Sequence, residues 1–113
     1  PIEERSSVAT LDDLRDARDA VSNVTVEKAV REYVTRLSGY TREHAQLGVS
    51  PRGSIALLRA AQARAALAGR AYVVPDDVQA EARVVMPHRV QTTTAETTGQ
   101  DVVSAALDTV AVE

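Results

Sequence analysis

The stretch from Ser50 to Gly69, SPRGSIALLRAAQARAALAG, predicts a helix that is marked at both of its ends. Ser50 is a favourable N-cap, and Pro51 suits the first helical position because no backbone amide donor is needed there. Gly69 is a natural left-handed residue for the C-terminal end. Apolar residues recur between the two ends at helical spacing, at Ile55, Leu58, Ala61, Ala65 and Ala68. The many alanines allow another helix to approach closely, so this stretch predicts one member of a packed bundle.

Further helices are predicted on both sides of this one. The first begins at Thr10, where Asp13 can reach back to the capping residue, and ends at about Ser22. The others are expected over about 26–42, 75–86 and 101–110, each with an apolar stripe. Residues 91–100 lack apolar periodicity and predict a long polar loop before the last helix. The expected fold class is therefore all-α, a small bundle of four to five helices. In the first of these helices, one apolar face is marked by Leu11, Leu14, Ala17 and Val21.

Composition excludes several kinds of function. The chain has 113 residues, no cysteine and two histidines, so thiol catalysis and cysteine-based zinc sites are excluded, and no metal site is expected. A net charge of −3, a single lysine and three aromatic residues disfavour nucleic acid as a partner. No apolar run approaches the roughly 18 residues of a membrane-spanning helix, and the polar residues 1–5 predict no export signal.

The sequence also lacks the parts of a nucleotide triphosphatase site. A phosphate-binding loop of the Walker type needs two glycines with a lysine after the second, and no glycine lies shortly before Lys28, the only lysine. No apolar strand ends in the paired acids that hold magnesium. The chain by itself is therefore expected to be inactive as an ATPase.

Arg52 occupies the second position of the predicted helix 51–68, beside free backbone amides and the positive end of the helix dipole. Such a place attracts an anion, and a planar guanidinium adds bidentate recognition of phosphate. The simpler interpretation is a solvated arginine on an ordinary capped helix. The local pattern alone favours this simpler interpretation.

The segment GVSPRG at 48–53, followed by SIALLRAA at 54–61, resembles a motif of MoxR-type AAA+ ATPases. The resemblance continues through AGRAYV at 68–73, PDDV at 75–78 and HRV at 88–90. Upstream, Tyr33-Val34 with Thr41-Arg42 is similar to a helix of the same family, and PIEE at 1–4 is similar to the segment that leaves the ATPase core. The resemblance covers nearly the whole chain and is strongest over 33–90.

The resemblance implies a role as the C-terminal helical lid of a longer ATPase. Residues 1–9 would be the linker from a core domain, and 10–113 the lid that closes over ATP, with Mg²⁺ held by the core. Arg52 would be the sensor 2 residue that assists catalysis by contacting the terminal phosphates, with Ser50 and Pro51 on the phosphate side. The family implies a cytoplasmic protein, ring neighbours (commonly in hexamers), and chaperone-like remodelling of clients, often with von Willebrand A domains.

The sequence departs from the family pattern at two positions. Gly53 stands where the family usually has alanine, and we expect it to loosen the first turn by up to about 1 kcal/mol. Val74 stands where the family often has threonine, which removes an N-cap at a cost of roughly 1 kcal/mol. Both departures predict a less rigid lid.

Several charged residues keep more than one interpretation. Arg42 can face the core domain or a neighbouring subunit, or it can complement the dipole at the end of its helix. Asp76 and Asp77 are interpreted as acids of a helix start rather than metal ligands, and the His88-Arg89 pair as a structural tether. Residues 45–75 contain no acid, so this stretch carries a strip of positive charge. The strip can face nucleotide, the core domain, nucleic acid or solvent, and this leaves open the roles of Arg59, Arg64 and Arg70.

Two other function classes compete with the ATPase lid. A helical DNA-binding domain would lay the helix 51–68 and its arginines along a groove, against the acidic net charge. A protein-interaction module would use the alanine-rich face of that helix or the last helix.

Overall fold

The computed structural model describes residues 10–112 and is built of helices joined by loops. The α-helices are α2 (Leu11–Ser22), α3 (Lys28–His44), α4 (Pro51–Leu67), α5 (Pro75–Val85) and α6 (Gly99–Thr109), with a 3₁₀ turn η1 (Pro87–Arg89) after α5. Within the described range no strand forms, and isolated bridges join Thr25 to Tyr72 and Leu47 to Gln91. The predicted all-α class is confirmed. The linker expected at residues 1–9 lies outside the described residues.

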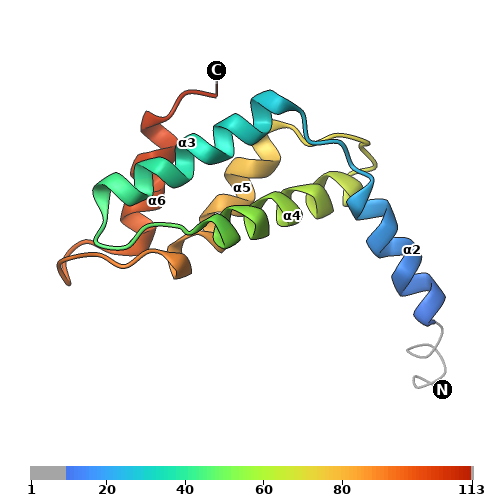
Figure 1. Ribbon diagram of the computed structural model, residues 1–113, viewed down its shortest axis with the longest axis horizontal. Helices are drawn as coiled ribbons and strands as arrows, with labels where there is room; N and C mark the ends of the chain where they lie inside the picture. Colours follow the sequence, from blue (N-terminus) through green and yellow to red (C-terminus); the bar gives the residue numbers. More distant parts are fainter. Residues whose placement is uncertain (1–9, 113) are drawn as a thin grey trace.

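Helices α3, α4, α5 and α6 form the bundle, and α2 extends from one end of it (Figure 1). The core lies where the inward faces of these four helices meet. It is formed mainly by aliphatic side chains around the fully buried ring of Tyr33. Its other members include Val34, Leu37, Leu57, Val78, Met86 and Val103. None of the described helices has the length and apolar character needed to cross a membrane.

The N-terminal half of α4 faces the core differently from the prediction. Ala61 and Ala65 are fully buried as expected, and α4 packs extensively against α5. However, Ile55 is 58% exposed, while Leu57 is completely buried. The inward row is thus spaced by four residues, through Gly53, Leu57, Ala61 and Ala65. Ala68 is also exposed, so two of the five apolar positions of the predicted stripe lie outside the core.

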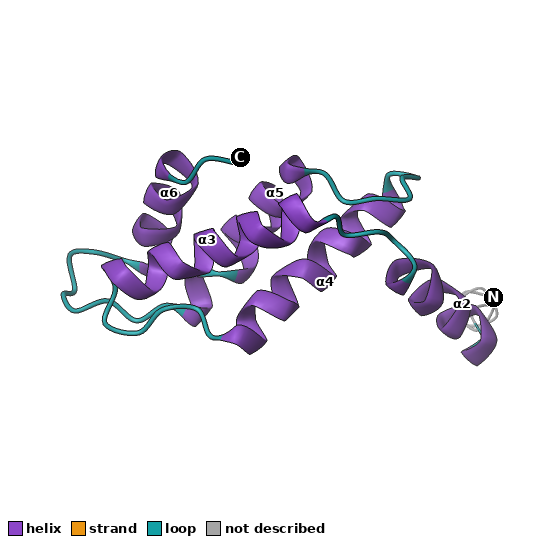
Figure 2. Cartoon of the chain, turned by 45° about the horizontal axis from the view of Figure 1, so that its top comes forward, coloured by secondary structure: helices purple, strands orange, loops and turns teal. Residues whose placement is uncertain are grey.

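Helix α2 has the predicted start but lies outside the core. The Oγ1 atom of Thr10 accepts a hydrogen bond from the Asp13 amide at 3.1 Å, and the Asp13 carboxylate accepts from the Thr10 amide at 3.0 Å. The helix nevertheless buries no residue, and Leu11 and Leu14 are 62% and 59% exposed. Figure 2 shows α2 projecting from one end of the bundle, where it contacts α4. The apolar face predicted for this helix is therefore not part of the core, although α2 contacts α4 at the end of the bundle.

The remaining ends follow local signals. Gly69 adopts a φ of 76°, the left-handed conformation expected after α4. The last helix starts at Gly99 rather than 101, because Thr98 and Asp101 form a capping box that shortens the polar loop. After α6, Arg36 donates to the carbonyl oxygens of Ala111 and Val112 at 3.0 and 2.7 Å, which holds the C-terminal segment against α3.

Two glycines provide a test of these backbone assignments. Gly39 lies inside α3, and a Cβ atom added there would meet no neighbouring segment within 4 Å. Gly39→Ala should therefore raise the free energy of unfolding by about 0.5–1 kcal/mol through helix propensity. Gly69→Ala should lower it by about 1 kcal/mol, because alanine is strained at positive φ. Urea denaturation of the two variants measures both changes, and a stabilising Gly69→Ala would contradict the assigned helix end.

Candidate functional site

The N-terminal turn of α4 presents an unpaired guanidinium at the positive end of a helix. Ser50 caps the helix, since its Oγ accepts a hydrogen bond from the Gly53 amide at 3.1 Å, and Pro51 occupies the first turn. Arg52 is exposed and makes no hydrogen bond or ion pair with any of residues 10–112. The arrangement places a guanidinium at the positive end of the helix dipole, which suits an anion approaching from outside the domain.

The loop that leads into this turn is held by the end of α3. The Val49 amide donates to Thr41 Oγ1 at 3.0 Å, and the Nη1 atom of Arg42 donates to the Val49 carbonyl oxygen at 2.7 Å. Val49 itself is fully buried. Of the interpretations left open for Arg42, this geometry shows a contact within the domain, from an exposed side chain to the loop before α4.

Gly53 has a packing role that its sequence position did not reveal. It is buried, and a Cβ atom there would lie 2.8 Å from Val49 Cγ1 and 3.1 Å from Arg89 Cδ. The expectation that Gly53 merely loosens the turn is therefore incomplete, because the missing Cβ lets Val49 and the stem of Arg89 pack against the helix. His88 and Arg89 form the end of η1 and are both exposed.

Two arginines of residues 45–75, the stretch without acids, form ion pairs with acidic residues of α5. Arg70 binds Asp77 in a bidentate pair, with Nη1 to Oδ2 at 2.6 Å and Nη2 to Oδ1 at 2.7 Å. Arg64 lies 3.8 Å from carboxylate oxygens of both Asp77 and Glu81. These two arginines therefore tie the C-terminal part of α4 and the segment after it to α5. Arg52 and Arg59 of the same stretch form no ion pair with residues 10–112.

Asp77 is the buried centre of that pairing. Its side chain is 1% exposed, and it also accepts a hydrogen bond from the Val74 amide at 2.9 Å. The hydrogen bond from Arg70 lowers the pKa of Asp77, while burial acts in the opposite direction. Asp77 thus acts as an acid of the helix start, as interpreted, and also as an ion-pair partner. In the part of the chain that the structure describes, no group of three acids or histidines gathers as a metal site would require.

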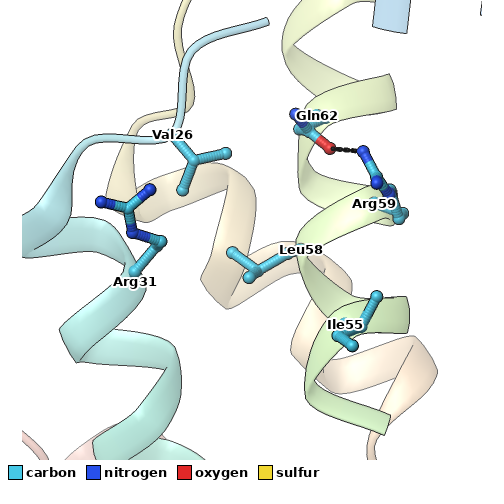
Figure 3. A pocket seen from close by; sticks show the side chains of 6 residues that line it. All are labelled: Val26, Arg31, Ile55, Leu58, Arg59 and Gln62. Atoms are coloured by element: carbon cyan, nitrogen blue, oxygen red, sulfur yellow. Dashed lines mark hydrogen bonds between the residues drawn. The ribbon is translucent and has the colours of Figure 1, made fainter. Parts of the chain in front are cut away.

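A groove of about 420 Å³ runs between the start of α3 and the middle of α4 (Figure 3). Val26 and Leu58 point into it, Arg31 lies on the α3 side, and Arg59 lies on the α4 side. Arg59 Nη1 donates to the Oε1 atom of Gln62 at 3.1 Å.

The groove and Arg52 share one face of α4. Arg52, Ile55 and Arg59 are spaced by three and four residues, which places them on the same side of a helix. Ile55 lines the groove and is more than half exposed. This face therefore offers apolar surface between two guanidiniums.

Comparison with known proteins places the chain among ATPase lids. The model of the AAA lid domain family matches residues 39–107. The protein YeaC of Bacillus subtilis is 46% identical over 91 residues, which cover 79% of this chain and 28% of YeaC. Protein MoxR of Methylorubrum extorquens is 48% identical over 56 residues, covering 49% and 16% of the two chains. Chaperone MoxR1 of Mycobacterium tuberculosis is 34% identical over 88 residues, covering 68% and 23%.

A solved structure agrees with these relatives. The crystal structure of a predicted ATPase from Cytophaga hutchinsonii superposes with a TM-score of 0.82 at 26% identity, covering 88% of this chain and 35% of that one. The matched part of the chain thus spans between 16% and 28% of the length of these curated relatives.

The buried ion pair makes stability depend on pH in a defined direction. Because the folded state lowers the pKa of Asp77, its contribution is fully present above the ordinary value of about 3.9 and is lost as pH falls through the lowered pKa. Asp77→Asn should therefore lower the free energy of unfolding by about 2 kcal/mol at pH 7, and by much less near pH 2.

Urea denaturation at the two pH values measures this difference. The exposed neighbouring acid supplies the control, since Asp76→Asn should change stability little at either pH. An Asp77→Asn deficit of equal size at pH 7 and pH 2 would contradict the assigned ion pair.

Proposed function

The chain belongs to the AAA lid domain family, as a lid of the MoxR type, and from this membership we propose that Arg52 is the sensor 2 arginine of a AAA+ ATPase. In this proposal the lid closes over ATP bound to the core domain of the parent protein. Arg52 then contacts the terminal phosphates, with Ser50 and Pro51 on the phosphate side. Closing and opening of the lid couple ATP hydrolysis to chaperone-like remodelling of client proteins.

One observation carries the proposal: the Arg52 guanidinium is exposed and unpaired among residues 10–112, at the N-terminal turn of α4. An arginine needed only for folding would be expected to have a partner, as Arg64 and Arg70 do. An arginine that must bind phosphate needs the opposite, a guanidinium left free on a rigid support.

The physical mechanism follows from this placement. The γ-phosphate carries the negative charge that a guanidinium and a helix N-terminus favour, and hydrolysis followed by phosphate release removes it. The free energy of the closed lid therefore differs between the ATP state and the ADP state, and the lid changes position with the nucleotide.

The face shared by Arg52, Ile55 and Arg59 is the surface that we propose to close on the core domain and its nucleotide. Ile55 on this face is more than half exposed and lines the groove. An exposed apolar side chain at a groove supports a face that another domain covers. Mg²⁺ and the phosphate-binding loop would belong to the core domain, so ATP turnover is a property of the parent protein. The 113-residue chain alone should show none.

The wider assembly is proposed on the same family grounds. Neighbouring subunits of a ring, commonly a hexamer, and clients with von Willebrand A domains would be the partners, in the cytoplasm. One relative bears the name Chaperone MoxR1, which supports a remodelling role. The competing DNA-binding function has less support, because Asp77 and Glu81 take up two arginines of the strip that would have to face DNA.

Substitution of the proposed sensor tests this function directly. In the parent ATPase, Arg52→Ala should lower kcat by about 100-fold, because a charge contact made to the reacting phosphates is lost. The thermal unfolding midpoint should stay close to that of the wild type, since Arg52 has no partner among the described residues. A phosphate-release assay on the purified parent protein measures the turnover.

A second exposed arginine provides the matched control. Arg83 lies in the last turn of α5, is exposed, and makes no ion pair with residues 10–112. Arg83→Ala removes the same charge from the domain and should leave kcat within about 2-fold. Unchanged turnover in Arg52→Ala would remove this residue from the mechanism.

A further inference from the structure

We propose that Thr41 and Arg42, at the C-terminal end of α3, are positioning residues that hold the Arg52 turn in the geometry needed for phosphate contact. This inference rests on the function proposed for Arg52 and assigns a role to the Thr41-Arg42 pair that the family resemblance alone left open.

Both side chains bind the backbone of Val49, three positions before Arg52. The Val49 amide donates to Thr41 Oγ1 at 3.0 Å, and its carbonyl oxygen accepts from Arg42 Nη1 at 2.7 Å. The Val49 side chain is meanwhile fully buried in the core. The backbone immediately before α4 is therefore bound through its donor, its acceptor and its side chain, which leaves it little freedom to move relative to α3.

The contacts continue past the loop into α4 itself. Thr41 Oγ1 donates onward to the Ser38 carbonyl oxygen at 2.6 Å, and the hydroxyl oxygens of Ser38 and Ser54 lie 2.6 Å apart. Thr41 and Ser38 are 0% and 1% exposed. Buried hydroxyls of this kind are costly unless every partner is in place, so the chain formed by Thr41, Ser38 and Ser54 favours a single register between α3 and the first turn of α4.

The close approach of the two segments depends on Gly48. A Cβ atom at this position would lie 2.4 Å from the backbone nitrogen of Arg42 and 2.5 Å from its Cα. Only glycine allows the loop to lie this near to the backbone of α3, and that nearness brings Val49 within reach of both side chains.

These contacts fix the backbone of Arg52 relative to α3. Helix α3 carries Tyr33, Val34 and Leu37 in the core, so the Arg52 turn is tied to the main body of the bundle rather than to a free loop. A misplacement of about 1 Å is enough to lower a rate strongly when a charged group must meet a reacting phosphate. The polar contacts of Thr41 and Arg42 oppose such a displacement.

The test is a double-substitution cycle in the parent ATPase, with kcat, KM for ATP and the thermal midpoint measured together. Thr41→Val keeps the side-chain volume and removes both hydrogen bonds, so it should lower kcat by about 10-fold. Thr41→Ser retains the hydroxyl and should recover most of the rate. In the Arg52→Ala background, Thr41→Val should cause no further loss of kcat, because a residue that acts through Arg52 has nothing left to position.

Arg42→Met tests the same role at an exposed side chain, where the substitution does not disturb the core as Thr41→Val could. It should lower kcat in the same direction, and Arg42→Lys should recover part of it. Asp77→Asn is the control for stability alone, since it weakens the domain at α5 and makes no contact with the loop 48–50. It should lower the thermal midpoint with little change in kcat.

The outcomes separate this inference from the proposed function. If Arg52→Ala abolishes turnover while Thr41→Val and Arg42→Met lower it no more than Asp77→Asn does, the positioning role is wrong and the sensor role stands. Additive losses in the double variant Thr41→Val/Arg52→Ala would equally overturn the positioning role. If Arg52→Ala leaves turnover unchanged, both proposals fail together.

Discussion

The attachment of Val49 to the end of α3 is the constraint that fixes where α4 begins. A loop before a helix is normally free to shift, because its backbone groups bind water as readily as protein. Here Thr41 and Arg42 bind the donor and the acceptor of Val49, and the core binds its side chain. The helix that follows, α4, therefore starts at a fixed position relative to α3. The backbone of Arg52, in its first turn, is fixed with it.

The arginines at the two ends of α4 differ in whether an acidic side chain pairs with them. Asp77 and Glu81 project from α5 toward Arg64 and Arg70, and these pairs fasten the far end of α4. No acid of the described residues pairs with Arg52 at the near end. One end of the same helix is thus stabilised by ion pairs within the domain, while Arg52 at the other end has no acidic partner among the described residues.

The surfaces outside the core fit a domain that works against another. Leu11 and Leu14 on α2, and Ile55 beside the groove, remain more than half exposed although the bundle itself is well packed. Exposed aliphatic side chains on an otherwise closed core are typical of faces that a second domain covers. The relatives of this chain are several times longer than the part matched here, so further protein is available in them to provide such a cover.

Local signals allowed the sequence by itself to place the start of α2 and both ends of α4, and its motifs indicated the family. The Thr10–Asp13 box, Ser50-Pro51 and Gly69 act over four residues or fewer, and the structure has all of them where the pattern predicted. Which face of α4 is buried, and which arginines are paired, was decided only by the tertiary structure. Ile55 and Leu57 are both aliphatic, so periodicity could not separate them, and the bond from Thr41 to Val49 joins different segments of the chain. Contacts of that kind exist only after the helices have packed, because no residue near Thr41 in sequence signals its partner.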